Sequence, residues 1–417
     1  LYTADDRRII DAIASWWVVT HGHCHPHIVR AIQEQAEQLN QIIFAGHTHD
    51  PAETVAAQLL KLAPDGLDYV FFSDSGSTSV EVALKMALGY WHNIGVPRTR
   101  IIVMEHSYHG DTVGTMSVGA RGVFNKAYEP LLFDVASIPF PAAGCEQATL
   151  DALEAACREQ TAAAFIVEPL ILGAGGMLMY PAWVLKEMKR ICEVFGVLFI
   201  ADEVMTGWGR TGRFWGHEHF DGRPDVLITA KGIASGFPIS AIAASTELMS
   251  KAWPGSQGGT YGGNAVSAAA GVATLGVVEK EGLVENSRVR GEQLQAGLKQ
   301  IQQRFPVIRE VVSQQQGCRT YLPGAAPGVL TEARKAELVA EVRADLDAAL
   351  PGIRVLDPGA GRAVALAHGL FAALVDRIEA AGGSLDWGSE ADGGWRVAAT
   401  VPRTRGEEIG RASCRER

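Results

Sequence analysis

The chain has 417 residues, of which 47% are hydrophobic and 20% charged, and its formal net charge is −10. This composition is typical of a globular protein, and the length predicts two or three domains. Because the basic residues are scattered, the sequence lacks the electrostatic footprint of a nucleic-acid-binding protein. No apolar run reaches the roughly 18 residues of a membrane span. We therefore expect neither nucleic acid nor a membrane as partner.

The six cysteines are widely spaced and form no Cys-x-x-Cys pair, which predicts reduced thiols and a cytoplasmic location. The histidine-rich tract from His21 to His27 has no spacing typical of a tetrahedral metal site, so a polar loop is favoured over metal. The chain opens on Leu1 without a signal peptide, and we expect a truncated N-terminus.

Apolar runs that are typical of strands alternate with helical patterns through the middle of the chain. Strands are predicted at 68–72, 100–104, 163–167, 196–201 and 226–229, and helices at 79–90, 150–158 and 182–195. Such alternation predicts a parallel sheet covered on both faces. Ligands of such sheets bind at the carboxyl ends of the strands, so the chemistry should follow each run.

Two segments have the composition of a phosphate-binding turn. Ser75-Gly76-Ser77 lies between a predicted strand and a predicted helix, where backbone N–H groups and the helix dipole favour an anion. A serine N-cap without any ligand would explain the same residues. The glycine-rich stretch 258–264 adds the hydroxyl of Thr260 as a second candidate phosphate contact.

Three further signals follow predicted strands. Tyr108, with His109 and Gly110 after it, could stack on a flat cofactor, or it could be a packed aromatic residue. Asp202, in the run Asp202-Glu203-Val204, could pair with a protonated pyridine nitrogen, or it could cap a turn. Lys231 follows an apolar run that could desolvate its amine for Schiff-base formation, although a solvated lysine is the common alternative.

At these residues the chain resembles the class III (omega) aminotransferases. The resemblance implies an α/β architecture, PLP-dependent transferase fold type I, with a mainly parallel sheet in a large domain and a split and incomplete small domain. It also implies pyridoxal 5'-phosphate (PLP) as cofactor, a small-molecule amino donor and keto acceptor as substrates, and a homodimer in which Thr260 reaches the partner's site. Catalytic roles fall on Lys231, Asp202 and Tyr108, and cofactor contacts on Ser75, Gly76, Ser77, Tyr108, His109, Glu168, Asp202, Val204, Lys231 and Thr260.

Within the family, residues 1–213 most resemble members of biotin synthesis that use S-adenosylmethionine as donor. Ser15-Trp16-Trp17 and the stretch 206–212 carry this likeness, and we expect Trp16, Trp17 and Arg210 to contact substrate. Residues 213–311 are more similar to 4-aminobutyrate-type members. The donor therefore stays open between these two types.

After about residue 316 the family pattern ends. Residues 375–403 resemble the last hairpin of a histidine kinase, without its nucleotide-binding boxes, and residues 408–417 resemble adapter sequence. We expect a foreign tail that packs poorly, after a small-domain part at 1–40, a large domain at 41–280 and the start of a second small-domain part at 281–315. A PLP-binding but inactive mosaic and a nucleotide-binding signalling module are the remaining alternatives.

Overall fold

The computed structural model describes residues 1–2, 4, 6, 8–251, 253 and 255–304, together with short strands at 311–312, 319–320, 384–389 and 395–400. The described residues fall into two compact units. One unit contains residues 13–291, and the other contains residues 1–12, residues 292–304 and the four short strands. Each unit is described by itself.

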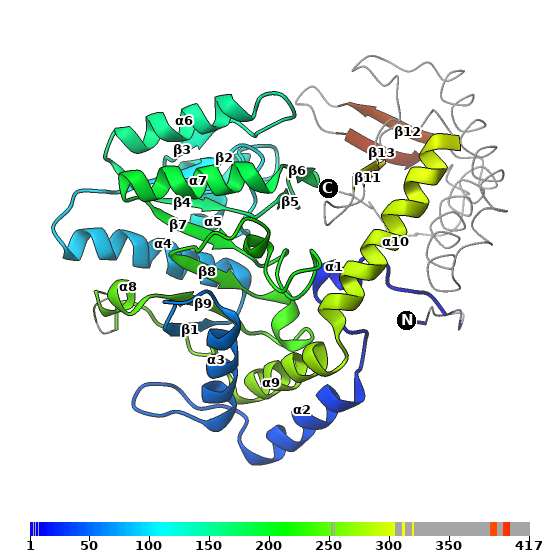
Figure 1. The fold of residues 1–417 in the computed structure, drawn as a ribbon. Helices are drawn as coiled ribbons and strands as arrows, with labels where there is room; N and C mark the ends of the chain where they lie inside the picture. Colours follow the sequence, from blue (N-terminus) through cyan, green and yellow to red (C-terminus); the bar gives the residue numbers. More distant parts are fainter. Residues whose placement is uncertain are drawn as a thin grey trace, which may run out of the picture. The chain divides into compact units, whose positions relative to one another are not determined.

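A seven-stranded sheet forms the centre of the 13–291 unit (Figure 1). Its strands are ordered β1-β9-β8-β7-β4-β2-β3, and only the pairs that β9 makes, with β1 and β8, are antiparallel. The bounds are β1 Tyr69–Ser73, β2 Arg100–Met104, β3 Ala136–Ile138, β4 Ala162–Val167, β7 Leu198–Asp202, β8 Val226–Thr229 and β9 Ser240–Ala244. All strands except β9 therefore end at one edge of the sheet.

Helices cover both faces of this sheet. Alternate residues of a strand point to opposite faces. Ile102 and Phe165 accordingly share a core with helices α6, Glu146–Arg158, and α7, Ala182–Phe195, which lie side by side (Figure 1). Ile101 and Ile166 instead pack on helix α4, Gly76–Asn93. Strands buried on both faces explain why their sequences are continuous apolar runs.

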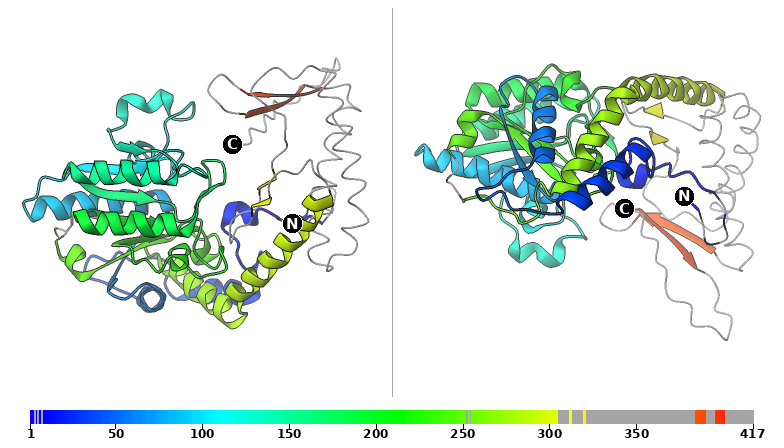
Figure 2. Two further views of the ribbon diagram at one scale, coloured as in Figure 1. Left: turned by 45° about the horizontal axis from the view of Figure 1, so that its top comes forward. Right: turned by 90° about the horizontal axis from the view of Figure 1, so that it is seen from below.

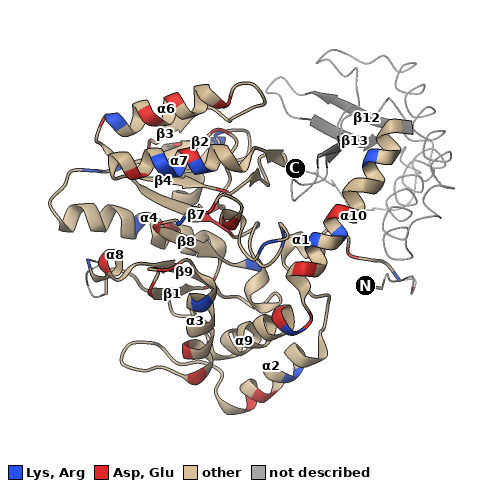
Figure 3. Ribbon diagram, viewed as in Figure 1, with Lys and Arg blue, Asp and Glu red and all other residues tan. Residues whose placement is uncertain are grey.

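A third core surrounds helix α9, Ala265–Lys280, which packs against α2, Pro26–Gln38, and α3, Asp50–Leu62. Its charged residues stand at its end, and Figure 3 shows the rest of this helix free of charge, in contrast to the mixed charges along α6 and α7. A helix that is apolar on all sides belongs in a protein interior.

Shorter elements complete the described residues. They are α1 Ala14–Trp17, α5 Val113–Ser117, α8 Thr246–Ser250, the 3₁₀ helices η1 Lys126–Leu131, η2 Gly216–His219 and η3 Lys231–Ala234, and the pair β5 Ile171–Leu172 and β6 Leu178–Met179. Helix α10, Leu283–Arg304, is one long continuous helix in both views of Figure 2. The strands β10 Val311–Val312 and β11 Arg319–Thr320 pair antiparallel, as do β12 Ser384–Ser389 and β13 Trp395–Thr400.

The predicted α/β class, with a mainly parallel sheet covered on both faces, is confirmed. Two strands were not predicted from the sequence: β3, which has only three residues, and the antiparallel β9, which is rich in alanine. The predicted domain bounds stay predictions, and most of the 316–417 tail lies outside the described residues. Within the described part of the chain, no helix has both the length and the apolar character needed to cross a membrane.

Candidate functional site

The segments singled out by sequence meet at the carboxyl edge of the sheet. The serine turn, Ser75-Gly76-Ser77, follows β1, and the tyrosine segment, Tyr108-His109-Gly110, follows β2. Glu168 follows β4, and Lys231 comes two residues after β8. Asp202 is the last residue of β7. Because these strands run in the same direction, their carboxyl ends bring five segments that are distant in sequence to one edge of the sheet.

Asp202 forms a buried pair with His109. Nδ1 of His109 lies 2.7 Å from Oδ2 of Asp202, and both residues are about 4% exposed. The other carboxylate oxygen, Oδ1, accepts a hydrogen bond of 3.1 Å from the backbone N–H of Val204. Nε2 of His109 is buried and has no hydrogen-bond partner among the described residues. The pair therefore satisfies the carboxylate in a place where water is excluded.

Glu168 is a second buried carboxylate at this edge. Its Oε1 accepts a hydrogen bond of 3.0 Å from the N–H of Tyr108, and its Oε2 accepts one of 2.9 Å from the N–H of Gly173. Burial raises the pKa of Glu168 to about 7; the charge of Asp202 adds to this, whereas His109 opposes it. The carboxyl group thus changes its charge near neutral pH.

Lys231 carries the amine of the site. Burial lowers the pKa of Lys231, and the negative charges of Asp202 and Glu168 act in the opposite direction. Its Nζ lies 5.2 Å from the centre of the Trp17 ring. The residue opens η3 with a φ of 45°, in the left-handed region that a lysine rarely adopts. Desolvation makes this amine a better nucleophile than an ordinary lysine.

The serine turn begins helix α4. Ser75 is its N-cap and exchanges hydrogen bonds with Thr78 in a capping box. A Cβ at Gly76 would lie 3.2 Å from the Val204 side chain, so the turn comes close to the end of β7. A Cβ at Gly110 would lie 2.1 Å from Oγ of Ser77. The first turn of an 18-residue helix thus lies against the segments that carry Asp202 and Tyr108.

Tyr108 keeps one part of its side chain accessible. It is 38% exposed, and its hydroxyl donates a hydrogen bond of 3.0 Å to Asp111. Glu81 of α4 fixes the segment that follows, because its carboxylate accepts hydrogen bonds from Thr112 Oγ1, 2.6 Å, and Gly114 N, 2.8 Å. The Tyr108 side chain is therefore held by Asp111, and its backbone N–H is held by Glu168.

Of the three residues predicted to contact substrate, Trp17 and Arg210 lie near Lys231, whereas Trp16 is exposed. Trp17 lies over Lys231, and its carbonyl accepts a hydrogen bond of 3.4 Å from Arg210. Burial lowers the pKa of Arg210, and its positive charge acts on Lys231. Trp16, in contrast, is 67% exposed. Thr260 is exposed as well, and its carbonyl accepts a hydrogen bond of 2.6 Å from Gln41.

Two histidines of the early tract have protein partners. Nε2 of His21 lies 2.8 Å from the hydroxyl of Ser235, and Nε2 of His25 lies 2.9 Å from Glu281. Burial lowers the pKa of His21 to about 4, and the nearby His25 adds to the effect. Among the residues that the structure describes, no three histidine, cysteine or acidic side chains gather as metal ligands would.

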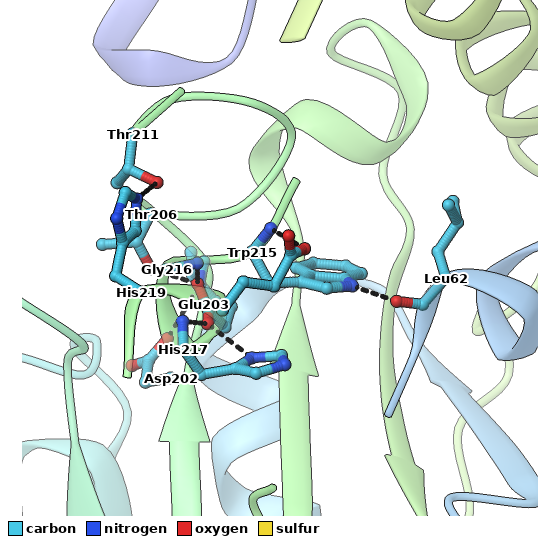
Figure 4. Close-up of polar contacts among 11 residues, drawn as sticks. Leu62, Asp202, Glu203, Thr206, Thr211, Trp215, Gly216, His217 and His219 are labelled. Atoms are coloured by element: carbon cyan, nitrogen blue, oxygen red, sulfur yellow. Dashed lines mark hydrogen bonds and ion pairs between the residues drawn. The ribbon is translucent and has the colours of Figure 1, made fainter. Parts of the chain in front are cut away.

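One part of the edge was not found from the sequence. Glu203, directly after Asp202, is wholly buried and is surrounded by Thr206, Gly216 and His217 (Figure 4). The signal that could have revealed it is a second acidic residue at the end of a buried strand. A charge there requires a partner, and His217 lies within the following loop.

Comparison with known proteins extends these observations. The family described as Aminotransferase class-III matches residues 1–318. An adenosylmethionine-8-amino-7-oxononanoate aminotransferase of Synechococcus elongatus is 44% identical over 301 residues, which cover 68% of this chain and 71% of that protein. Across six relatives that carry this name, the chain spans 58–71% of their length.

Solved structures agree with this relationship. The adenosylmethionine-8-amino-7-oxononanoate aminotransferase of Methanocaldococcus jannaschii has a TM-score of 0.70 and 30% identity, over 75% of this chain and 74% of that one. An amine transaminase from an uncultivated Pseudomonas species, solved in its PLP-bound form, has a TM-score of 0.74 and 28% identity, over 88% of this chain and 90% of that one. The chain belongs to the class III aminotransferases, a PLP-dependent family.

Proposed function

We propose that this aminotransferase uses Lys231 to attach PLP and transfers an amino group from S-adenosylmethionine to 8-amino-7-oxononanoate, a step of biotin synthesis. The observation that carries the catalytic part is the desolvated amine of Lys231 beside two buried carboxylates, Asp202 and Glu168. The substrates are inferred from the names of the relatives.

The residues at the carboxyl edge fit the chemistry of PLP. The N-terminus of α4, with Ser75, Gly76 and Ser77, would hold its phosphate. Asp202 would accept a hydrogen bond from its protonated pyridine nitrogen, with His109 holding the carboxylate in place. Because Gly76 has no side chain, space remains beside the turn for the cofactor. A Cβ at Gly76 would fill the space toward Val204 and Ala230.

When bound, PLP supplies an electron-withdrawing ring that stabilises negative charge on the substrate carbon. The protein would supply the remaining groups. Asp202 would keep the ring nitrogen protonated, the Tyr108 ring would stack on the cofactor, and Lys231 would take a proton from one carbon and return it to another through Nζ. A lowered pKa suits this task, because a larger fraction of the amine is neutral and can accept a proton.

Trp17 and Arg210 are the residues that we expect to meet substrate. Trp17 adds an apolar wall over Lys231, and Arg210 adds a positive charge at the same place. The apolar methylene chain of 8-amino-7-oxononanoate would contact the indole, and its terminal carboxylate would pair with the guanidinium group. Trp16, which is 67% exposed, stays a proposed substrate contact as well.

A comparison of amino donors tests the substrate proposal. The PLP-bound protein is mixed with S-adenosylmethionine or with 4-aminobutyrate, and single-turnover loss of the cofactor's visible absorbance is followed. Faster loss with S-adenosylmethionine is expected. Faster loss with 4-aminobutyrate would move the chain to the alternative donor class, and loss with neither donor would favour an inactive PLP-binding mosaic.

We infer that two copies of the chain assemble. Large apolar side chains are exposed on two segments, Val123–Leu131 and the loop around Thr260, where Trp253 is 71% and Tyr261 62% exposed. Such side chains are the usual material of protein interfaces. In this proposal Thr260 contributes to the phosphate site of the partner. Light scattering of the purified chain should give the mass of a dimer, and a monomer would exclude a shared site.

A further inference from the structure

Glu203 is held by four hydrogen bonds in a fully buried position. Thr206 Oγ1 and the N–H of Gly216 donate to its Oε2, at 2.5 Å and 2.8 Å. The N–H of His217 donates to Oε1 at 2.8 Å, and Nδ1 of the same histidine lies 2.9 Å from this oxygen. Figure 4 shows the carboxylate enclosed by these residues. The loop that leaves β7 is thus closed onto its own first residue.

The surroundings of Glu203 favour its charged form. Burial alone would raise its pKa, but the hydrogen bonds from His217 and Thr206, with the charge of His217, outweigh burial and lower it. Asp202 and Glu203 are adjacent in sequence, yet their partners differ: His109 holds the first and His217 the second. Adjacent residues at the end of a strand point to opposite sides. Only one of the two carboxylates is therefore available to a cofactor.

A set of contacts leads from the Glu203–His217 pair to the backbone beside Lys231. Trp215, next to Gly216, packs on Trp208 with ring centres 6.2 Å apart. The indole N–H of Trp208 donates a hydrogen bond of 2.8 Å to Thr229, at the end of β8. The Trp208 ring also lies against Gly232, where a Cβ would stand 2.6 Å from its Cγ.

We propose that Glu203 is a positioning residue for Lys231: with His217 it fixes the 203–217 loop, so that Trp208 supports the backbone of the lysine. The left-handed conformation of Lys231 gives this support its purpose. A non-glycine residue at a φ of 45° persists only when its surroundings hold it. If the loop loosens, Trp208 no longer confines Gly232, and the Lys231 amine is no longer held in its position near Asp202 and Trp17.

Glu203→Gln tests this proposal, because it keeps the shape of the side chain and removes its charge. In the variant, an amide NH₂ group would replace one of the two carboxylate oxygens. This group is a donor and cannot accept the hydrogen bonds that the N–H groups of Gly216 and His217 make to Glu203. The matched control is Arg98→Met. Arg98 is buried and donates hydrogen bonds of 2.8 Å and 2.9 Å to the carbonyls of Gly196 and Phe195. It precedes β2, and therefore lies toward the opposite edge of the sheet.

The inference rests on the proposed attachment of PLP to Lys231, so the wild-type protein is tested first. Cofactor is removed, PLP is added back, and borohydride reduction at set times measures the rate at which Lys231 is labelled. Visible circular dichroism of the bound cofactor reports its orientation. Both are read well below the thermal midpoint of each variant. Glu203→Gln should slow labelling about tenfold or more and weaken the dichroism, because small displacements of a reacting group are costly. Arg98→Met should match the wild type in both.

Each outcome decides one point. A wild-type protein labelled on another lysine would overturn the proposed function. Labelling of Lys231 at the wild-type rate in Glu203→Gln, even with a lower thermal midpoint, would leave Glu203 a structural residue only. If Glu203→Gln does not fold, Thr206→Val, which removes one hydrogen bond to Glu203 and keeps the shape, replaces it. This variant should slow labelling in the same direction, and an unchanged rate would end the proposal.

Discussion

Nδ1 of His109 lies 2.7 Å from Oδ2 of Asp202, and both side chains are almost completely buried. His109 lies in the loop that follows β2, and Asp202 is the last residue of β7. The histidine and the backbone N–H of Val204 fix the direction of this buried carboxylate. This pair is therefore suited to holding a positively charged ring nitrogen.

Replacing Asp202 by Asn should leave PLP bound but slow the amino-transfer half-reaction by about 10²-fold or more, because a neutral amide cannot keep the pyridine nitrogen protonated. Stopped-flow absorbance in single turnover measures the rate. Asp151→Asn, on the exposed side of α6, is the control and should behave as wild type. An unchanged rate in Asp202→Asn would remove this residue from the mechanism.

Lys231 should be the residue that borohydride reduction labels with a pyridoxyl group. A second buried lysine provides the comparison. Nζ of Lys189 lies 3.3 Å from both Asp225 and Glu193, and these ion pairs hold it away from the carboxyl edge of the sheet. Peptide mass spectrometry should find the label on Lys231 alone, and Lys231→Ala should abolish it. A label that persists in this variant would contradict the assignment.

The sequence predicted five of the seven strands of the sheet and several of the polar residues at their ends. Buried parallel strands have continuous apolar runs, and polar residues that follow such runs are conspicuous, as Asp202 and Lys231 are. It was not sufficient for pairings across the fold. Nothing local to Glu203 indicates that His217 will reach it, because the loop returns through packing of Trp208 on Trp215. The left-handed backbone of Lys231 has the same origin in tertiary contacts.

The stability of the cofactor-free protein should depend on pH through Glu168. Its pKa is about 7 in the folded chain, raised first by burial, against an ordinary value of 4.5. The folded state therefore holds a proton that the unfolded state releases between these values. Stability from this group is complete below about pH 4.5 and is lost as the pH rises through 7, by up to about 3 kcal/mol.

Glu168→Gln removes this titration. The free energy of unfolding of the wild type and the variant is measured in urea at pH 5 and pH 8. The stability of the variant relative to the wild type should be higher at pH 8 than at pH 5. Glu187→Gln, on the exposed surface of α7, is the control and should show no such change. A difference between wild type and Glu168→Gln that is the same at both pH values would show that Glu168 does not titrate in this range.

Gly110 should tolerate no side chain, because two independent features of its environment exclude one. Its φ of +133° is a conformation that residues with a Cβ rarely adopt, and a Cβ would stand 2.1 Å from Oγ of Ser77. Gly110→Ala would thus displace either Ser77 at the start of α4 or the segment that carries Tyr108 and His109. We expect weaker PLP binding together with a lower thermal midpoint.

Gly89, in the same helix as Ser77, is the matched control for that substitution. A Cβ there meets nothing within 4 Å, so Gly89→Ala adds only helix propensity and should stabilise the chain by about 0.5–1 kcal/mol. Thermal unfolding and titration of the cofactor-free protein with PLP measure both effects. Both variants replace glycine by alanine. If their changes in thermal stability have opposite signs, the close approach of Gly110 to Ser77 is the cause of the destabilisation. Wild-type PLP affinity in Gly110→Ala would mean that the serine turn and the tyrosine segment do not form one site.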